Sequence, residues 1–203
     1  IVGFSMLGVA IQTNDGLVAD DYYNLSMSIS KIANNIKSID KSFPPVHKWN
    51  PDLCEGQEFF INRNGDWFYN DSPIKNFKLT KLFSSVLRRD NDLYYLVTPA
   101  EKVPVKTAIA PYVITDFNFN NNFLELDTNF EYSFRINKLN SIKLIEFENT
   151  TIPLVHVRDN IEGFFNRSTY YNLINFALEK NNIIDNVLYV KSGNNDYPVG
   201  KIA

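Results

Sequence analysis

The feature that most constrains the fold is a run of alternating segments between Ala110 and Phe147. "YVITDFNF" and "FLELD" alternate apolar and polar residues and meet at Asn121, and "YSFRI" and "IKLIEF" continue the pattern. A period of two is typical of strands that bury one face, and the short polar breaks favour hairpin turns. The sequence therefore predicts an antiparallel meander here.

Amphipathic helices are predicted on both sides of this meander, because apolar residues recur at steps of three and four over residues 25–39, 79–87 and 170–178. We expect the Ser72 hydroxyl to cap the second helix, and Arg88 and Arg89 to lie at its C-terminus, where cations are favoured. The third helix is expected to end near Lys180-Asn181.

The stretch "NRNGDWFYNDSPI" predicts a hairpin, with Asn64-Gly65 in the turn and Trp67 to Tyr69 in the returning strand. The order strand, bend, helix and strand follows from "WFY" to "YYLVTP", and recurs from "LVHV" to "VLYVKSG". This shared order favours an α+β protein of two related units, each a helix with an antiparallel sheet, that arose by internal duplication.

The expected organisation is a leader over residues 1–20, an α+β unit over 21–108 and a β-rich unit with one long helix over 109–203. The apolar run from Ile1 to Ile11 is shorter than the roughly 20 residues that a bilayer span needs. We therefore interpret it as the start of a truncated or extended chain. A remnant of a targeting or membrane segment is the alternative.

The charge and the scarcity of cysteine and histidine disfavour several functions. A net charge of -3 gives no basic field for a nucleic-acid polymer. One cysteine, Cys54, allows no internal disulfide, and two histidines, His47 and His156, allow no credible His/Cys metal cluster. We expect a cytoplasmic protein without a cofactor, for which a membrane role is disfavoured.

No catalytic constellation is apparent in the sequence. The 8 glycines form neither a Walker-type nor a Rossmann phosphate loop. Both histidines are better explained by structural roles, and the carboxylate pairs fall in turns and flanks. An enzyme that uses Glu101 or His156 as its base is the least favoured of the functional hypotheses.

Seven motifs in register resemble the bacterial domain-of-unknown-function family 1285. They are "PPVHKWNP", "NGDWFYNDSPI", "LFSSVLRRD", "YYLVTPAEKVPV", "APYV", "DTN" and "SGNNDYPVG". The resemblance implies a duplicated two-domain α+β protein whose second part is superficially similar to pleckstrin-homology domains. It also implies a ligand site at the domain interface, for a nucleotide-like molecule, and a role in signal transduction.

Two positions depart from the pattern of that family. Asn76 follows the Ser-Pro-Ile turn where an arginine is usual, and Phe164 stands where another arginine is common, whereas Arg167 is retained. If those arginines bind phosphate in the family, their loss weakens that role here, although Lys75 and Lys78 offer point charges nearby.

The strand exit "TPAEKVPV" is the most unusual polar segment, because prolines fix its backbone beside a hydroxyl, a carboxylate and a cation. The structural alternative is that Glu101 and Lys102 simply close an inter-domain salt bridge. If the two units are related, an interface pocket would gather the candidate ligand residues, with aromatic rings stacking on a base. These candidates are Trp67, Tyr69, Thr98, Glu101, Lys102, Arg158, Arg167 and Tyr171.

The leading hypothesis is a non-enzymatic regulatory protein that binds a nucleotide-like anion between its two units. The second is a protein-interaction module that uses the meander of Ala110 to Phe147 as its docking surface. A concave polar pocket would favour the first hypothesis, and a flat exposed apolar patch would favour the second.

Overall fold

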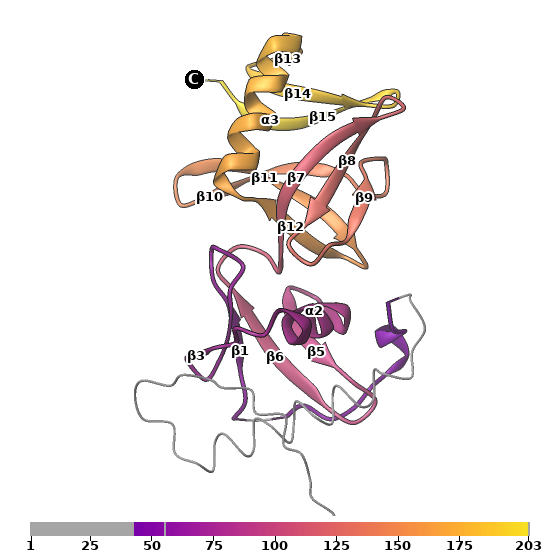
Figure 1. Cartoon of the computed structure of the whole chain (residues 1–203), viewed down its shortest axis with the longest axis vertical. Helices are drawn as coiled ribbons and strands as arrows, with labels where there is room; N and C mark the ends of the chain where they lie inside the picture. Colours follow the sequence, from indigo (N-terminus) through magenta and orange to yellow (C-terminus); the bar gives the residue numbers. More distant parts are fainter. Residues whose placement is uncertain (1–42, 55, 203) are drawn as a thin grey trace, which may run out of the picture. The chain divides into compact units, whose positions relative to one another are not determined.

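The computed structural model describes residues 43–54 and 56–202. The expected leader and the predicted helix of residues 25–39 lie outside the described residues. In the described part the chain forms two six-stranded sheets, one three-stranded sheet and two α-helices, preceded by the short 3-10 helix η1 (Val46–Lys48). The protein is therefore of the α+β class (Figure 1).

The first sheet has the strand order β3-β2-β1-β6-β5-β4, and the helix α2 (Phe77–Ser85) connects β3 to β4 (Figure 1). Its strands are β1 (Phe59–Ile61), β2 (Trp67–Tyr69), β3 (Ser72–Pro73), β4 (Leu87–Asp90), β5 (Leu93–Val97) and β6 (Lys102–Thr107).

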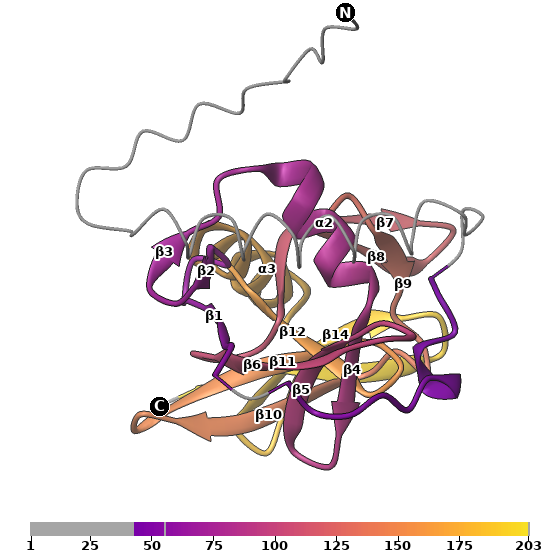
Figure 2. The same ribbon diagram turned by 90° about the horizontal axis from the view of Figure 1, so that it is seen from below.

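The second sheet has the order β10-β11-β12-β7-β8-β9, and Figure 2 shows its strands β10 and β11 side by side. Its strands are β7 (Tyr112–Asn120), β8 (Phe123–Thr128), β9 (Ser133–Arg135), β10 (Ile142–Phe147), β11 (Thr150–Arg158) and β12 (Ile161–Phe165). The helix α3 (Arg167–Lys180) follows and contacts β7. The chain then ends in a small antiparallel sheet of β13 (Ile183–Ile184), β14 (Val187–Ser192) and β15 (Asn195–Lys201).

The two large sheets are similar, because each consists of two three-stranded meanders. In each sheet, the first strand of the first meander and the last strand of the second meander lie side by side in the centre. These central strands are parallel: β1 pairs with β6, and β7 pairs with β12. The prediction of purely antiparallel sheets was therefore wrong. It followed neighbouring hairpins along the chain, whereas the central pairs join strands that are distant in sequence.

The position of the helix differs between the two meander pairs. α2 lies between the meanders of the first sheet, whereas α3 follows both meanders of the second. The predicted repeat of strand, bend, helix and strand therefore aligned strands that hold different positions in the two halves of the structure. Val97 belongs to β5 of the first sheet, but Val190 belongs to β14 of the small third sheet.

The start of α2 differs from the prediction, whereas the end of α3 agrees with it. Asn76 caps α2 by accepting a hydrogen bond from the Leu79 backbone N–H at 3.2 Å, while Ser72 pairs in β3. Arg88 and Arg89 lie in β4 and not at the helix C-terminus. α3 ends as predicted, with Asn181 in the left-handed conformation.

Two-residue turns made of Asn, Asp or Glu join many neighbouring strands. Both turn residues have positive φ at 70–71, 121–122, 148–149, 159–160 and 185–186. Two successive positive φ values define the type I′ turn, whose twist matches that of the flanking strands. The first four of these turns join strands of the two large sheets, and the fifth joins β13 to β14 of the small sheet.

The predicted β1–β2 hairpin is present, although its connection spans residues 62–66 and only Gly65 of the Asn64-Gly65 pair has a positive φ, at 83°. A Cβ atom at Gly65 would lie 2.6 Å from Cγ2 of Val113. The hairpin therefore needs glycine here both for its backbone angle and for the close packing against β7.

An aromatic core surrounds Trp67, which is 1% exposed. Its ring contacts those of Phe59, Phe83 and Phe130 at centroid distances of 6.0 to 6.3 Å. Phe130 belongs to the connection between β8 and β9, so the apolar core continues from the first sheet to residues of the second half. Among the described residues, no helix combines the length and hydropathy that a membrane crossing requires.

Candidate functional site

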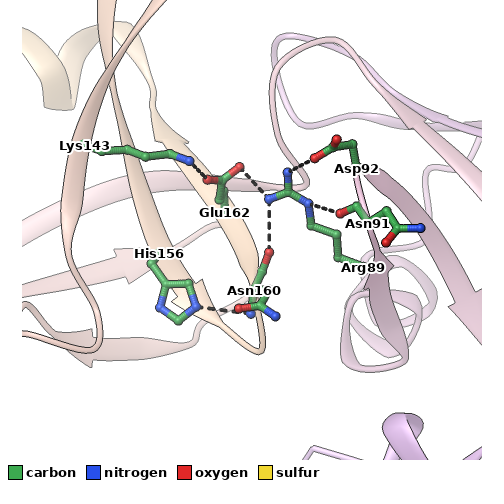
Figure 3. Close-up of polar contacts among 7 residues, drawn as sticks. All are labelled: Arg89, Asn91, Asp92, Lys143, His156, Asn160 and Glu162. Atoms are coloured by element: carbon green, nitrogen blue, oxygen red, sulfur yellow. Dashed lines mark hydrogen bonds and ion pairs between the residues drawn. The ribbon is translucent and has the colours of Figure 1, made fainter.

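A pocket with a volume of about 680 Å³ is lined by polar side chains from both halves of the described chain. Arg89 and Asn91 come from β4 and the turn after it. The remaining lining residues come from the β9–β10 connection, from β10 to β12 and from the β11–β12 turn: Lys138, Leu139, Ser141, Lys143, His156, Asn160 and Glu162. We call this the Glu162 pocket, and Figure 3 shows the polar contacts around Glu162 and Arg89.

Arg89 is fixed at the edge of this pocket by hydrogen bonds from all three of its guanidinium nitrogen atoms. Nε donates to the Asn91 carbonyl at 3.0 Å, Nη2 to Asp92 at 3.1 Å and Nη1 to Glu162 at 3.1 Å (Figure 3). Tyr94 is its cross-strand partner, and the guanidinium carbon lies 5.4 Å from that ring centroid. A planar guanidinium group held by several hydrogen bonds has little freedom to leave the edge of the pocket.

Charges around Arg89 also shift pKa values. Burial lowers the pKa of Arg89, but Tyr94, Glu162 and Asp92 outweigh burial and raise it above its ordinary value. Burial raises the pKa of the Tyr94 hydroxyl to about 12. Arg89 therefore stays a cation, and Tyr94 a neutral phenol, throughout the physiological range.

Glu162 joins the two halves of the pocket. Its side chain is 12% exposed, and its two carboxylate oxygens accept from Nη1 of Arg89 at 3.1 Å and from Nζ of Lys143 at 2.5 Å. The carboxylate is thus neutralised by two cations, one from β4 and one from β10. These two ion pairs explain why the charged Glu162 carboxylate is tolerated with so little exposure to solvent.

His156 lies directly opposite Glu162 in the β11–β12 pair. Its Nε2 accepts the backbone N–H of Asn160 at 3.2 Å, so the neutral ring carries its proton on Nδ1. Nδ1 is buried and finds no hydrogen-bond partner in the described part of the chain. The ring therefore has one unused donor beside the pocket.

The charge balance of the lining favours an anionic ligand. Three cationic side chains, Arg89, Lys138 and Lys143, accompany one carboxylate, Glu162, which is already paired twice. Lys138 is exposed and has no ion-pair partner among residues 43–54 and 56–202. Ammonium groups and amides are hydrogen-bond donors, which match phosphate or carboxylate oxygens.

Comparison with known proteins decides the family. The model described as "Domain of unknown function (DUF1285), N-terminal domain" matches residues 44–108, and "Protein of unknown function (DUF1285), C-terminal domain" matches residues 111–199. The chain belongs to the DUF1285 family. The resemblance seen in the sequence motifs is thereby confirmed. The Glu162 pocket draws its lining from both DUF1285 domains.

A solved structure of a DUF1285 protein agrees. A DUF1285 family protein from Silicibacter pomeroyi DSS-3 is 30% identical, with a TM-score of 0.73 over 84% of this chain and 95% of that chain. A DUF1285 family protein from Shewanella baltica OS155 is also 30% identical, with a TM-score of 0.49 over 60% of this chain and 94% of that chain. None of the curated proteins compared with the chain matches it.

The structure does not gather the eight candidate ligand residues in the Glu162 pocket. Trp67 and Tyr69 both contact the ring of Phe59 in the core. The Thr98 hydroxyl is buried and accepts from the backbone N–H of Glu101 at 3.0 Å. None of the eight lines the pocket.

Three further candidates, Lys102, Arg167 and Tyr171, have interaction partners outside the pocket. Lys102 pairs with Asp90 at 2.7 Å and lies 4.0 Å from the centroid of Tyr95. Asp90 belongs to the same domain as Lys102, so this ion pair is not the inter-domain bridge of the alternative interpretation. Arg167 lies over the ring of Tyr171 at 5.5 Å, within α3. Asp90 accepts from both Lys102 and Arg88.

Arg158 has a structural position, with a side chain that is 5% exposed. Its Nη2 donates to the Ser84 carbonyl of α2 at 2.6 Å, and its Nε donates to the Tyr112 hydroxyl at 3.0 Å. The guanidinium carbon lies 4.0 Å from the ring centroid of Phe43. Burial raises the pKa of Tyr112, while Arg158 partly opposes that rise.

Both departures from the family pattern also have structural roles. Asn76 caps α2, and Phe164 packs in a buried apolar cluster with Ala110, Val113 and Leu154. An arginine in this cluster would have to reach a partner outside it. These positions therefore say little about a phosphate site in this chain.

Of the pocket residues, only His156 and Arg89 were singled out from the sequence, and Arg89 and Glu162 were assigned to the wrong elements. Arg89 was assigned to a helix end, and Glu162 to a polar bend before α3. The available signal was Asp159-Asn160, since a two-residue turn there pairs residue 158 with residue 161 and brings β11 beside β12. The β-bulge between His156 and Arg158, which places residue 156 opposite residue 162, has no such signal.

Proposed function

We propose that the protein is a non-enzymatic regulatory protein that binds a small, nucleotide-like anion in the Glu162 pocket and acts in signal transduction. The observation that supports this most strongly is the excess of cations over carboxylates in the pocket, where Glu162 is already paired with Arg89 and Lys143. Because both DUF1285 domains contribute to the lining, binding an anion there would stabilise their mutual contacts.

The chemistry of the lining matches a phosphate with a small attached group. Lys138, Lys143 and Arg89 offer point charges or guanidinium N–H groups for phosphate oxygens. Leu139 and the imidazole of His156 offer apolar surface for a flat ring. One unpaired cysteine, Cys54, also suits our expectation of a cytoplasmic protein.

A thermal-shift series tests this function. The purified protein is heated with inorganic phosphate, adenosine and guanosine monophosphates, or their cyclic forms, each at several concentrations. A ligand at 100 times its dissociation constant stabilises the folded state by about 2.7 kcal/mol, so the melting temperature is expected to rise with concentration.

Variants that remove single lysine charges test whether the thermal shift arises from binding in the Glu162 pocket. Lys138→Gln and Lys143→Gln are expected to reduce the shift, whereas Lys106→Gln is the matched control, because Lys106 is exposed, pairs with Glu58 and does not line the pocket. The absence of a shift with all these ligands, or an equal shift in all three variants, would contradict the proposal.

A protein-interaction module that uses the C-terminal sheet is the second candidate, and exposed apolar residues favour it. Leu139 in the β9–β10 connection is 81% exposed, and Ile183 and Ile184 of β13 are also exposed. A docking surface would leave such side chains uncovered in the free protein. Leu139→Ser should then abolish recovery of a specific partner in a pull-down, and failure to recover any partner would remove this candidate.

We also propose that the two large sheets descend from one duplicated unit, the second of which is similar to pleckstrin-homology domains. Their shared strand order and their parallel central pairs support the duplication. A helix at a different place in each unit requires that one helix was gained or moved afterwards.

A further inference from the structure

A second pocket, of about 790 Å³, lies where the C-terminal end of α3 meets the tips of two hairpins. The β7–β8 and β14–β15 tips are joined by a hydrogen bond of 2.8 Å from the Gly193 N–H to the Asn122 carbonyl (Figure 1). None of its lining residues belongs to the Glu162 pocket. We call it the α3 pocket.

Aromatic rings form one wall of the α3 pocket. Phe119 and Phe176 are stacked with centroids 4.5 Å apart and an interplanar angle of 26°, and Phe117 packs edge-on against both. Phe119 remains 38% exposed. A ring held rigidly by two others and open to a polar pocket offers a flat apolar surface for the apolar face of a ligand.

Side-chain amides and one carboxylate line the rest of the pocket. Asp196 accepts from the amide of Asn182 at 2.7 Å through one oxygen, which leaves its other oxygen as an acceptor. Within the described residues, the side-chain amides of Asn122 and Asn194 make no hydrogen bond. Each amide offers two donors and one acceptor oxygen, so the lining supplies donors and acceptors together.

The excess of positive charge is smaller in the α3 pocket, with two lysines and one carboxylate, than in the Glu162 pocket, with three cations and one carboxylate. Lys191 lies directly opposite Asp196 in the β14–β15 pair. Lys180 lies 5.3 Å from the centroid of Phe176 in the last turn of α3, where both the ring and the helix carbonyls favour a cation. Each lysine therefore has a carboxylate or an aromatic ring as a neighbour that favours its charge.

We propose that the α3 pocket binds a neutral sugar unit. A pyranose has one apolar face of C–H groups, which would lie on Phe119, and hydroxyl groups that each donate and accept a hydrogen bond. Asp196 and the amides of Asn122 and Asn194 are matched to such hydroxyls. An anion would need an excess of donors, and a purely apolar ligand would leave these amides unpaired.

Saturation-transfer NMR on the full chain tests this site. The probes are glucose, galactose, N-acetylglucosamine, maltose and cellobiose, with adenosine monophosphate as an anionic aromatic comparison. At about 10 mM a sugar that binds with a dissociation constant of about 1 mM nearly saturates the site. We expect at least one sugar to receive magnetisation at its C–H protons from the aromatic resonances of the protein.

Variants assign the signal to the α3 pocket. Phe119→Ala and the nearly isosteric Asp196→Asn are each expected to weaken sugar binding at least tenfold, while Lys143→Gln in the Glu162 pocket leaves it unchanged. Preserved amide spectra show that each variant is folded.

Three results would overturn the inference. They are no transfer to any of the five sugars, full transfer in both α3-pocket variants, or binding of adenosine monophosphate in place of sugars at these residues. Because nucleotide binding to the Glu162 pocket responds to Lys143→Gln and not to Phe119→Ala, failure of one proposal is distinguishable from failure of the other.

Discussion

At the scale of single residues, Glu162 connects the electrostatics of the pocket to its stability. It is the shared acceptor of Arg89 and Lys143, so removing its charge leaves a half-buried guanidinium with one fewer partner. The same change also removes the carboxylate that competes with an incoming anion for these two cations. Stability and binding are therefore expected to change in opposite directions.

Glu162→Gln should lower the free energy of unfolding by about 1.5–3 kcal/mol, the range for a hydrogen bond to a charged group. It should also tighten the binding of an anion. Urea unfolding gives the first quantity and the thermal-shift series the second. Glu148→Gln is the control, because Glu148 pairs with Arg63 at the surface and should cost less than about 1 kcal/mol. Equal costs for both variants would contradict the account.

Asp90 gives a prediction on pH. Burial alone raises its pKa, but hydrogen bonds from Arg88 and Lys102 outweigh burial and lower the pKa below its ordinary value. A lowered pKa in the folded state means that Asp90 stabilises the fold above the pKa of about 3.9 of the unfolded chain. This contribution is lost as the pH falls through the folded pKa.

Asp90→Asn should therefore be less stable than the wild type at pH 7, and the difference should shrink below about pH 4, where Asp90 of the unfolded chain becomes protonated before Asp90 of the folded protein. Urea unfolding of both proteins between pH 7 and pH 3 measures it. A difference that stays constant over this range would show that the charge of Asp90 does not contribute.

At the scale of elements, turns were the part of the fold that the sequence predicted best. The hairpin at Asn121 and the strands "FLELD", "IKLIEF" and "LYYLV" follow from period-two patterns and polar breaks, and the structure confirms them. The sequence prediction was wrong where a turn signal and a helix-start signal lie next to each other. Ser72-Pro73 looked like a helix start, yet it pairs with β2, because Asn70-Asp71 turns the chain first.

The candidate site was less predictable than the fold, for a physical reason. The Glu162 pocket depends on the pairing of β7 with β12 and on contacts between β4 and β12, which join residues distant in sequence. Local periodicity carries no information on such pairs. Only the turn at Asp159-Asn160 was accessible, and the β-bulge that places His156 opposite Glu162 was not.

The β10–β11 turn tests the role of left-handed residues. Asn149 has a φ of 63°. Asn149→Gly should leave stability unchanged or raise it slightly, whereas Asn149→Val should cost about 1–2 kcal/mol, because a β-branched residue is strained there. Thermal unfolding of the two variants compares them directly. If valine is tolerated as well as glycine, the turn does not set the register.

At the scale of the whole molecule, the two DUF1285 domains share buried contacts. Arg158 and Tyr112 both donate to the Ser84 carbonyl at the end of α2, and Phe130 packs against Trp67. These contacts predict that the described part of the chain unfolds as one cooperative unit, with coincident transitions by tryptophan fluorescence and far-ultraviolet circular dichroism.

Arg158→Met tests this coupling. It keeps an apolar stem but removes the donors to Ser84 and Tyr112, so the free energy of unfolding should fall by about 2–4 kcal/mol. Arg167→Met is the matched control, because Arg167 contacts only the exposed Tyr171 among the described residues and should cost less than about 0.5 kcal/mol. Equal urea midpoints for Arg158→Met and the wild type would refute the coupling.

The most direct test of the anion-binding function is an NMR titration of the isotopically labelled full chain with adenosine and guanosine monophosphates. The account predicts that the largest backbone amide shifts occur at Asn91, Ser141 and Asn160, which line the Glu162 pocket, and that Lys138→Gln and Lys143→Gln weaken them. Shifts confined to residues outside this pocket, or none at saturating nucleotide, would contradict it.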